Sequence, residues 1–199
     1  MRIVGGAFAG RTLPGKPPEG TRPTADRVRE AIASALQARG LLEGAVVLDL
    51  YAGTGALGLE ALSWGAKRLI AIDSSPAALR CIRTNADALG IESQVTTVKL
   101  ELGRGGATEQ VARLARVCDE PVTLLLADPP YAQIGALTPV LEALAAQRPE
   151  GPAAILAPSA AILVEHAHKT ALPIPAGFLE VARYRYGDTA VLLALRDAL

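Results

Sequence analysis

The stretch Asp49-Leu-Tyr-Ala-Gly-Thr-Gly-Ala-Leu-Gly58 decides the fold of this 199-residue chain. It follows residues 46–50, an apolar run that predicts a buried strand, and leads into residues 56–64, where apolar positions recur at helical spacing. Gly53 and Gly55 let the backbone approach a ligand closely, where a Cβ would obstruct it. The amino end of the helix would direct free N–H groups at that ligand. This stretch therefore predicts a nucleotide-binding α/β unit.

The alternation of strand and helix continues along the chain. Further strands are predicted at residues 68–72, 95–100, 122–127 and 161–165, and further helices at 25–39, 76–89, 109–118 and 137–147. Continuous apolar strands that alternate with helices are typical of a parallel sheet covered on both faces. Residues 180–186 and 189–195, joined at Gly187-Asp188, predict an antiparallel hairpin instead. The expected fold class is α/β.

Composition indicates one domain with an aliphatic core, because 50% of the residues are hydrophobic and only 4% are aromatic. Cys81 and Cys118 stand outside any Cys-x-x-Cys or Cys/His ligand spacing, so neither a disulfide framework nor a metal site is expected. The first residues lack the apolar core of a signal peptide. The longest charge-free run, 151–164, contains two prolines and is too short to span a bilayer. These features predict a soluble cytoplasmic protein without membrane contact.

Charge is unevenly distributed, although the net charge is zero. Residues 1–40 carry seven basic and three acidic side chains, a net charge of +4. A basic end indicates contact with a polyanion, or simply a solvated charged surface. Residues 2–13 predict two short strands around a glycine-rich turn, and residues 14–23 contain four prolines and two glycines. The predicted organisation is an amino-terminal hairpin and linker, residues 1–23, followed by one domain, residues 24–199.

Two acidic residues accompany the glycines at positions suited to a nucleotide. Asp49 lies four residues before Gly53, and Asp73 ends the second predicted strand, 20 residues after Gly53. An acid at the position of Asp73 can accept hydrogen bonds from ribose hydroxyls. It could instead cap the following helix, but Ser74 and Ser75 are better candidates for that role. The Gly-x-Gly-x-x-Gly spacing also satisfies the dinucleotide fingerprint. An NAD-dependent oxidoreductase therefore remains open at this point.

A second motif, Asp128-Pro-Pro-Tyr131, follows the predicted strand at 122–127. Two prolines end a strand, and the residue before a proline is held extended. Asp128 is therefore placed at the carboxyl end of a buried strand, where open α/β sheets bind ligands. A fixed carboxylate, fixed backbone carbonyls and an aromatic ring suit a flat substrate that carries an amine, such as a nucleobase.

Asp128-Pro129-Pro130-Tyr131 resembles the Asp/Asn-Pro-Pro-Tyr/Phe motif of the amino-methyltransferases, which methylate exocyclic nitrogens with S-adenosyl-L-methionine. The resemblance implies this cofactor, a seven-stranded Rossmann-like methyltransferase fold, and catalytic roles for the four residues of the motif. In such enzymes an acid at the position of Asp49 helps to hold the amino acid end of the cofactor. The implied cofactor site consists of Asp49, Tyr51, Ala52, Gly53, Thr54, Gly55, Asp73, Ser74 and Glu101. Methyltransferases often have Asp or Asn where Glu101 stands, so Glu101 either faces the adenine amino group or is a solvated turn residue.

The amino end is similar to the leading signature of one family, the bacterial small-subunit ribosomal RNA guanine-N2 methyltransferases. At the amino end the similar stretches are residues 2–6, 10–14 and 21–30. Two later stretches, residues 52–62 and 128–131, also fit the family. The resemblance covers most of the chain and is weak at 100–120 and 145–180. It implies methylation of one guanine of 16S rRNA, within an assembled or partly assembled small ribosomal subunit. Nothing in the sequence demands more than a monomer.

The resemblance implies RNA contacts by five arginines of the amino end: Arg2, Arg11, Arg22, Arg27 and Arg29. Arginines on phosphates give affinity and salt dependence rather than sequence choice. Arg27 and Glu30, three apart on a helix, could pair with each other instead.

Three alternatives to this function stay open. A DNA adenine-N6 methyltransferase shares the Asp128 motif but usually needs a separate target-recognition domain. An NAD-dependent oxidoreductase shares the fold, and a non-catalytic RNA-binding protein would keep only the cofactor site. His166 and His168 follow an apolar strand without a ligand pattern around them, so both are predicted to be surface residues.

Overall fold

The computed structural model describes residues 1–16, 26–148, 151 and 154–197. These residues contain five α helices, seven strands and three short 3-10 helices, so the expected α/β fold class is confirmed. No helix among them is long and apolar enough to cross a bilayer. The chain divides into two compact units, Met1–Leu100 and Glu101–Leu199. The boundary predicted between residues 23 and 24 lies outside the described residues.

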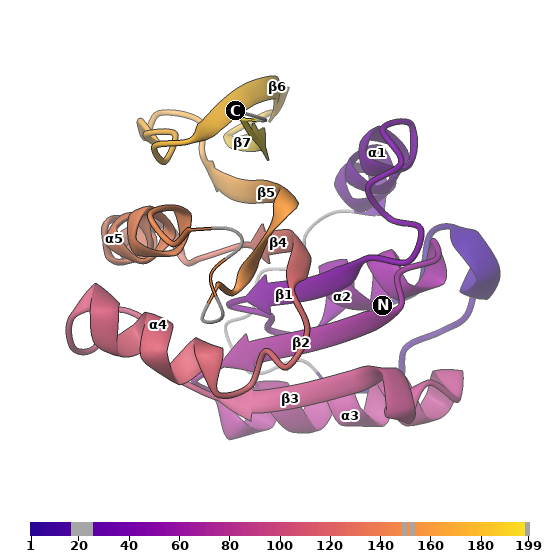
Figure 1. The fold of residues 1–199 in the computed structure, drawn as a ribbon. Coiled ribbons are helices and arrows are strands. Elements are labelled where there is room, and N and C mark those ends of the chain that lie inside the picture. The colour runs from indigo at the N-terminus through magenta and orange to yellow at the C-terminus, as the bar shows by residue number, and fades with distance from the viewer. Residues whose placement is uncertain (17–25, 149–150, 152–153, 198–199) are drawn as a thin grey trace. The chain divides into compact units, whose positions relative to one another are not determined.

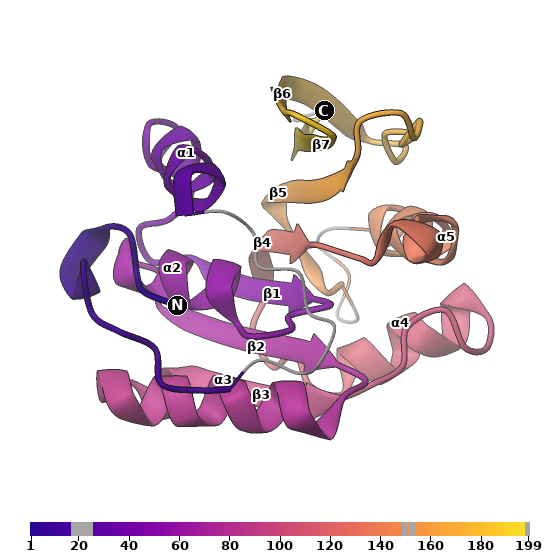
Figure 2. The ribbon, with the colours of Figure 1, turned by 180° about the vertical axis from the view of Figure 1, so that it is seen from behind.

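The first unit is built on three parallel strands, β1 (Val46–Leu50), β2 (Arg68–Asp73) and β3 (Val95–Lys99). β2 lies between the other two and pairs with both. The helices of this unit are α1 (Asp26–Gln37), α2 (Ala56–Ser63) and α3 (Pro76–Leu89). Helices α2 and α3 cover the same face of the three strands, and α1 contacts α2 (Figures 1 and 2).

Helix α3 shows how local sequence sets the ends of an element. Ser75 accepts a hydrogen bond from Ala78 N (3.3 Å), as an N-cap residue does, which confirms it as the better cap candidate. Pro76 stands at the first helical position, where its missing N–H leaves no bond unmade. Gly90 ends the helix with a φ of +73°, a conformation that favours glycine. Both end signals are local, and the helix covers the predicted range.

The second unit contains the remaining helices and strands: α4 (Ala107–Ala115), α5 (Ile134–Ala145), β4 (Val122–Ala127), β5 (Leu156–Ala167), β6 (Phe178–Tyr186) and β7 (Thr189–Arg196). β4 and β5 are parallel, and β7 runs antiparallel between β5 and β6. The predicted antiparallel hairpin is confirmed, since Tyr186 pairs with Thr189 across the turn.

β5 is the element that departs most from its predicted range, because it begins at Leu156 rather than at residue 161. Its pairing with β4 is irregular: Val122 faces Leu156, whereas Leu124 faces Ala161. Pro158 is exposed within the resulting bulge. Proline has no N–H for the ladder and occurs at bulges, so it interrupts the apolar pattern without ending the strand.

The amino-terminal segment (residues 1–16) forms a smaller hairpin than the predicted pair of strands. A single antiparallel bridge joins Arg2 to Thr12, and a 3-10 helix, η1 (Gly6–Phe8), occupies the turn. Ile3 and Leu13 are buried, so the segment is part of the core of the first unit. The segment runs along the outer side of α2 and then of α3 (Figure 2).

The prediction that His166 is a surface residue is wrong, because His166 is only 1% exposed on β5. Its Nδ1 lies 3.0 Å from Ala167 O, and its Nε2 lies 3.3 Å from Arg183 Nη1 on β6. Burial lowers the pKa of His166, so the neutral ring is favoured. His168 is exposed, as predicted.

Candidate active site

The glycine loop (residues 51–55) turns the chain from β1 into α2 through left-handed backbone conformations. The φ angle is +62° at Tyr51, +56° at Gly53 and +77° at Gly55. Tyr51 is the one residue other than glycine with a positive φ in the described part of the chain. Such a conformation costs about 1–3 kcal/mol, persists only where the surroundings impose it, and clusters at functional sites. The loop is therefore a constrained structure rather than a simple linker.

Two carboxylates hold the glycine loop in place. Asp73 Oδ2 accepts a hydrogen bond from Gly53 N, and Asp73 Oδ1 accepts one from Ser75 N, both at 2.8 Å. Asp49 is buried and accepts a hydrogen bond from Gly58 N (3.2 Å) in the first turn of α2. The structure thus brings both predicted acids to the loop. Asp49 supports it from inside the unit, whereas Asp73 is half-buried beside it.

The groups around the loop have the chemistry that a nucleoside ligand requires. The N-cap residue of α2 is Gly55, which has no side chain to cap the helix, and Asp49 binds the N–H of Gly58, so the amino end ahead of Gly58 can face a ligand. The Tyr51 hydroxyl is buried and has no hydrogen-bond partner among the described residues. Burial raises the pKa of Tyr51 to about 12, so this hydroxyl stays protonated and can donate. Among the described residues, a Cβ at Gly53 would meet only Tyr51 O, at 3.9 Å, so none of them crowds the loop at this glycine.

The Asp128 motif begins directly after β4, as the sequence predicted. Asp128 is half-buried, Pro129 is buried and Pro130 is exposed. A 3-10 helix, η3 (Tyr131–Gln133), follows, and Gln133 N donates to Pro130 O (2.7 Å). The Tyr131 hydroxyl lies 3.1 Å from Thr189 Oγ1 at the start of β7. The position of Tyr131 is therefore fixed by the turn that contains its backbone and by the contact of its hydroxyl with Thr189.

Glu101 and Ser74 are the exposed members of the predicted cofactor set, while Ala52 is buried and Thr54 half-buried. Glu101 does not end β3 but lies two residues beyond it, at the start of the second unit. It forms an ion pair with Arg104 (3.0 Å), and both side chains are largely exposed. This geometry is that of a solvated turn residue, which was one of its two predicted alternatives.

The four described arginines of the predicted RNA-contacting set have different surroundings, and Arg22 lies outside the described residues. Arg27 is exposed. Arg2 is exposed and forms an ion pair with Asp26 (3.2 Å). Arg11 is exposed and donates to the carbonyls of Ala88 and Leu89 at the end of α3. These three can present charge at the surface.

The predicted RNA contact of Arg29 is corrected, because its side chain is 1% exposed. Its guanidinium donates to Arg2 O (2.7 Å) and Asp26 Oδ1 (3.0 Å), and lies 3.8 Å from Glu60 Oε2. A buried guanidinium with these partners is structural and does not reach a phosphate outside the protein.

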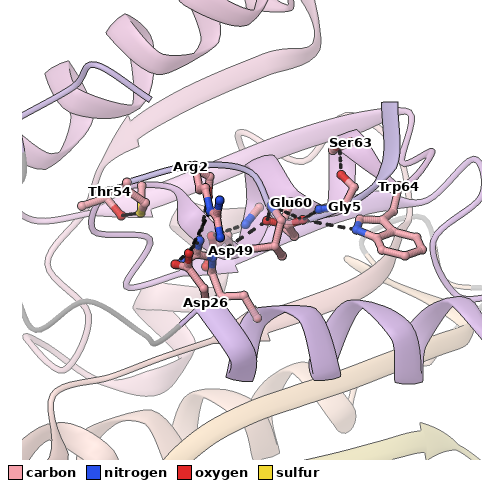
Figure 3. Close-up of polar contacts among 12 residues, drawn as sticks. Arg2, Gly5, Asp26, Asp49, Thr54, Glu60, Ser63 and Trp64 are labelled. Atoms are coloured by element: carbon pink, nitrogen blue, oxygen red, sulfur yellow. Dashed lines mark hydrogen bonds and ion pairs between the residues drawn. The ribbon is translucent and has the colours of Figure 1, made fainter. Parts of the chain in front are cut away.

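Glu60 is the second member of this buried network, and it attaches the amino-terminal segment to α2 (Figure 3). Its carboxylate accepts hydrogen bonds from Val4 N (3.1 Å), Gly5 N (2.8 Å) and Trp64 Nε1 (3.2 Å). Ser63 adds two bonds, donating to Gly5 O and accepting from Phe8 N. A Cβ on Gly5 would collide with the Trp64 ring, and one on Gly6 with the backbone of Ser63.

Comparison with known proteins identifies the relatives of this chain. A family model described as conserved hypothetical protein 95 matches residues 1–195. The chain belongs to this family. It is 29% identical over 196 residues to the putative rRNA methyltransferase YlbH of Bacillus subtilis, covering 97% of both chains. It is 51% identical over 63 residues to the ribosomal RNA small subunit methyltransferase D of Escherichia coli K12, 32% of this chain and 31% of that protein.

A solved structure of the putative methyltransferase YhhF from Escherichia coli matches with a TM-score of 0.77 at 31% identity, covering 100% of this chain and 99% of that one. The expected Rossmann-like methyltransferase fold is therefore confirmed. Like its relatives in this family, the chain is a methyltransferase, and S-adenosyl-L-methionine is its cofactor. The groups around the glycine loop fit this cofactor, since they offer N–H and hydroxyl donors together with the Asp73 carboxylate.

Sequence reasoning missed Glu60, Asn85 and the burial of Arg29. Glu60 and Asn85 are hydrogen-bonded to backbone groups more than 50 residues away, which no local pattern reveals. A signal for Arg29 did exist: it shares the buried stripe of α1 with Ile32, Ala33 and Leu36, at helical spacing.

Proposed function

We propose that this protein transfers a methyl group from S-adenosyl-L-methionine to the exocyclic N2 of a guanine in 16S rRNA of the small ribosomal subunit. The observation that carries the proposal is the half-buried Asp128 carboxylate at the end of β4, followed by a rigid Pro-Pro turn and a tethered tyrosine ring. The named activities of the relatives in Escherichia coli and Bacillus subtilis support ribosomal RNA as the substrate.

The cofactor supplies a methyl group bonded to a positively charged sulfur. In the proposed site the amino end of α2 and the backbone of Tyr51, Ala52, Gly53, Thr54 and Gly55 line one side of it. Asp73 accepts hydrogen bonds from the ribose hydroxyls. Its carboxylate can do so because it has more acceptor sites than its two observed hydrogen bonds, from Gly53 N and Ser75 N, use. Asp49 acts indirectly, by holding Gly58 N and hence the start of α2. Ser74 completes the proposed set at its exposed edge.

The proposed role of Asp128 is to orient and polarise the target amine. An exocyclic amine is a weak nucleophile because its lone pair is delocalised into the ring. Hydrogen bonds from this amine to Asp128 Oδ and to the Pro129 carbonyl would favour a pyramidal nitrogen and stabilise the positive charge that develops on it. Pro129 and Pro130 fix the direction of these acceptors, because proline restricts the backbone. The methylated amine then loses a proton to the carboxylate or to water.

Tyr131 is proposed to stack on the target base, and two substitutions separate its ring from its hydroxyl. Tyr131→Ala should weaken substrate binding by about 1–3 kcal/mol and reduce turnover, since it removes the stacking surface. Tyr131→Phe keeps the ring and removes the hydroxyl that contacts Thr189, so its effect should be much smaller. Methylation kinetics with rRNA substrate would measure both. A change in cofactor affinity alone, or equal losses in the two variants, would contradict the stacking role.

RNA is proposed to contact the amino end, residues 1–23, while residues 24–199 form the methyltransferase domain. Arg2 and Arg11 in this segment, and Arg27 just after it in the first turn of α1, are the described candidates for phosphate contacts. Arg27→Gln should lower the affinity for rRNA and reduce the slope of log K against log salt concentration by about 1. Binding titrations at several salt concentrations would test this, with Arg39→Gln as the control, since Arg39 is exposed in the turn just beyond the other end of α1. An unchanged slope for Arg27→Gln would remove it from the interface.

The direct test of the function is incubation with methyl-labelled S-adenosylmethionine and three substrates: unmodified small subunits, naked 16S rRNA and duplex DNA. Label in N2-methylguanosine from subunits or rRNA would support the proposal, and the comparison of those two would show whether ribosomal proteins are needed. Label in DNA N6-methyladenine would favour the alternative enzyme. A loop base, unstacked and presented to the enzyme, is the expected target.

We further propose that the protein works as a monomer in the cytoplasm, where its substrate is assembled.

A further inference from the structure

Asn85 on α3 joins two backbone segments that are distant in sequence. Its Oδ1 accepts a hydrogen bond from Gly15 N (2.7 Å) in the amino-terminal segment. Its Nδ2 donates to Thr54 O (3.2 Å) in the glycine loop and to Cys81 Sγ (3.6 Å). The Asn85 side chain is fully buried. Because an N–H only donates and a carbonyl only accepts, these partners fix the orientation of the amide, whose oxygen serves one and whose nitrogen serves the other.

The bond from Asn85 holds the glycine loop at the peptide group between Thr54 and Gly55. The carbonyl of this group is bound by Asn85, and its N–H is bound by Ala52 O (2.7 Å). The preceding glycine, Gly53, is bound by Asp73. Rotation of the Thr54–Gly55 peptide would break the bonds on both of its sides, so Asn85 contributes directly to the loop conformation that faces the cofactor.

The amino-terminal segment depends on the same side chain. Gly15 packs so closely on α3 that a Cβ there would lie 2.6 Å from Cys81 O and 2.7 Å from Asn85 Oδ1. If the segment lifted away, the buried Asn85 Oδ1 would lose the hydrogen bond that it accepts, which is costly for a polar group inside a protein. Met1 also reaches the loop, with its Sδ 3.6 Å from Thr54 Oγ1. The segment and the loop are thus joined at both ends of the hairpin.

We propose that Asn85 is a positioning residue that couples cofactor binding at the glycine loop to docking of the amino-terminal segment on α3. The inference rests on the proposed placement of the cofactor at that loop. Coupling is reciprocal: if a docked segment favours the loop conformation that binds the cofactor, bound cofactor favours the docked segment by the same factor. The segment carries Arg2 and Arg11, so the enzyme loaded with cofactor presents a better ordered surface to RNA.

The first test is the affinity for S-adenosylhomocysteine, measured by calorimetry, in Gly15→Ala. The added Cβ would collide with Cys81 O and Asn85 Oδ1, so it displaces the segment from α3 while the residues of α3 and of the loop are all retained. The affinity should fall about 10-fold, within the usual range of coupling factors. Lys16→Ala, at an exposed neighbouring position, should bind as the unmodified protein does. Equal affinities for Gly15→Ala and the unmodified protein would overturn the proposal.

A double-mutant cycle separates coupling from simple destabilisation. Asn85→Ala should weaken cofactor binding at least as much as Gly15→Ala, and should raise the KM for S-adenosylmethionine more than it lowers kcat. Adding Gly15→Ala to Asn85→Ala should cause no further loss, because the connecting side chain is already gone. Full additivity of the two losses would show that they act independently and would overturn the proposal. Circular dichroism confirms that each variant is folded before it is measured.

Hydrogen exchange gives a readout that does not depend on turnover. Adding S-adenosylhomocysteine to the unmodified protein should slow exchange of the Gly15 amide about 10-fold, by the same linkage. NMR shifts of Ala52, Gly53, Thr54 and Gly55 report binding at the loop in the same samples. If these signals shift and Gly15 exchange does not change, the coupling is refuted while the cofactor placement stands. If the loop signals do not shift although the ligand binds, the placement is wrong and the coupling fails with it.

Discussion

Replacing Asp128 with alanine should reduce methyl transfer to rRNA by about 100- to 1,000-fold, the range seen when one group that stabilises a transition state is removed. The effect should appear in kcat, because the carboxylate acts on charge that develops as the bond to the methyl group forms. The affinity for the cofactor should be nearly unchanged, since the proposed cofactor contacts come from the glycine loop and Asp73, whereas Asp128 is proposed to bind the target amine. Single-turnover methylation, together with calorimetry of S-adenosylhomocysteine, measures the two quantities separately.

Glu142→Gln is the matched control for this experiment. Glu142 is an exposed carboxylate on α5 in the same unit, so its loss tests for a general effect of removing negative charge. The variant Asp128→Asn would also be informative, because related motifs carry either residue and the amide keeps an acceptor oxygen. Near-normal turnover in Asp128→Ala would show that the assigned role is wrong.

Replacing Glu60 with alanine should lower the free energy of unfolding by about 3–5 kcal/mol, the usual cost of removing one partner of a buried ion pair. The substitution leaves the Arg29 guanidinium without the carboxylate 3.8 Å away. It also removes the acceptor for the N–H groups of Val4 and Gly5. Urea unfolding, followed by circular dichroism, measures the change.

The comparison for Glu60→Ala is Glu109→Ala on α4. Glu109 also forms an ion pair, with Arg113, but both side chains are about half exposed. Exposed pairs of this kind contribute about 0.3–0.5 kcal/mol, so this variant should unfold almost as the unmodified protein does. A loss below about 1 kcal/mol in Glu60→Ala would mean that the buried network can rearrange without this carboxylate.

Local patterns in the sequence were sufficient for most elements of the fold and for the two motifs. The strand, glycine loop and helix at residues 46–64 were predictable because strand burial, the glycines and helical spacing all act over short distances. The ends of α3 were predictable for the same reason, since Ser75, Pro76 and Gly90 are local signals. The placement of Asp128 followed from the restrictions that proline imposes on its neighbours.

The side-chain environments were less predictable, because they depend on partners that are distant in sequence. Arg29 was expected to contact RNA because of the family resemblance, yet Arg2 O and Glu60 supply buried partners. His166 was expected at the surface for want of a ligand pattern, yet β5 lies between two other strands. The start of β5 was missed because Pro158 forms a bulge instead of ending the strand. In each case tertiary contacts outweigh the local preference.

The attachment of Val4 and Gly5 to Glu60 determines which amino acid substitutions these positions can tolerate during evolution. The hydrogen bonds of Glu60 to these residues come from their backbone amides. Many amino acids at position 4 would therefore preserve the attachment, because every residue except proline carries the same N–H. Gly5 and Gly6 have no such freedom, since any side chain there would collide with α2 or with Trp64 just beyond it. Among relatives, position 4 should vary widely, while the two glycines and the acid at position 60 should be replaced only together.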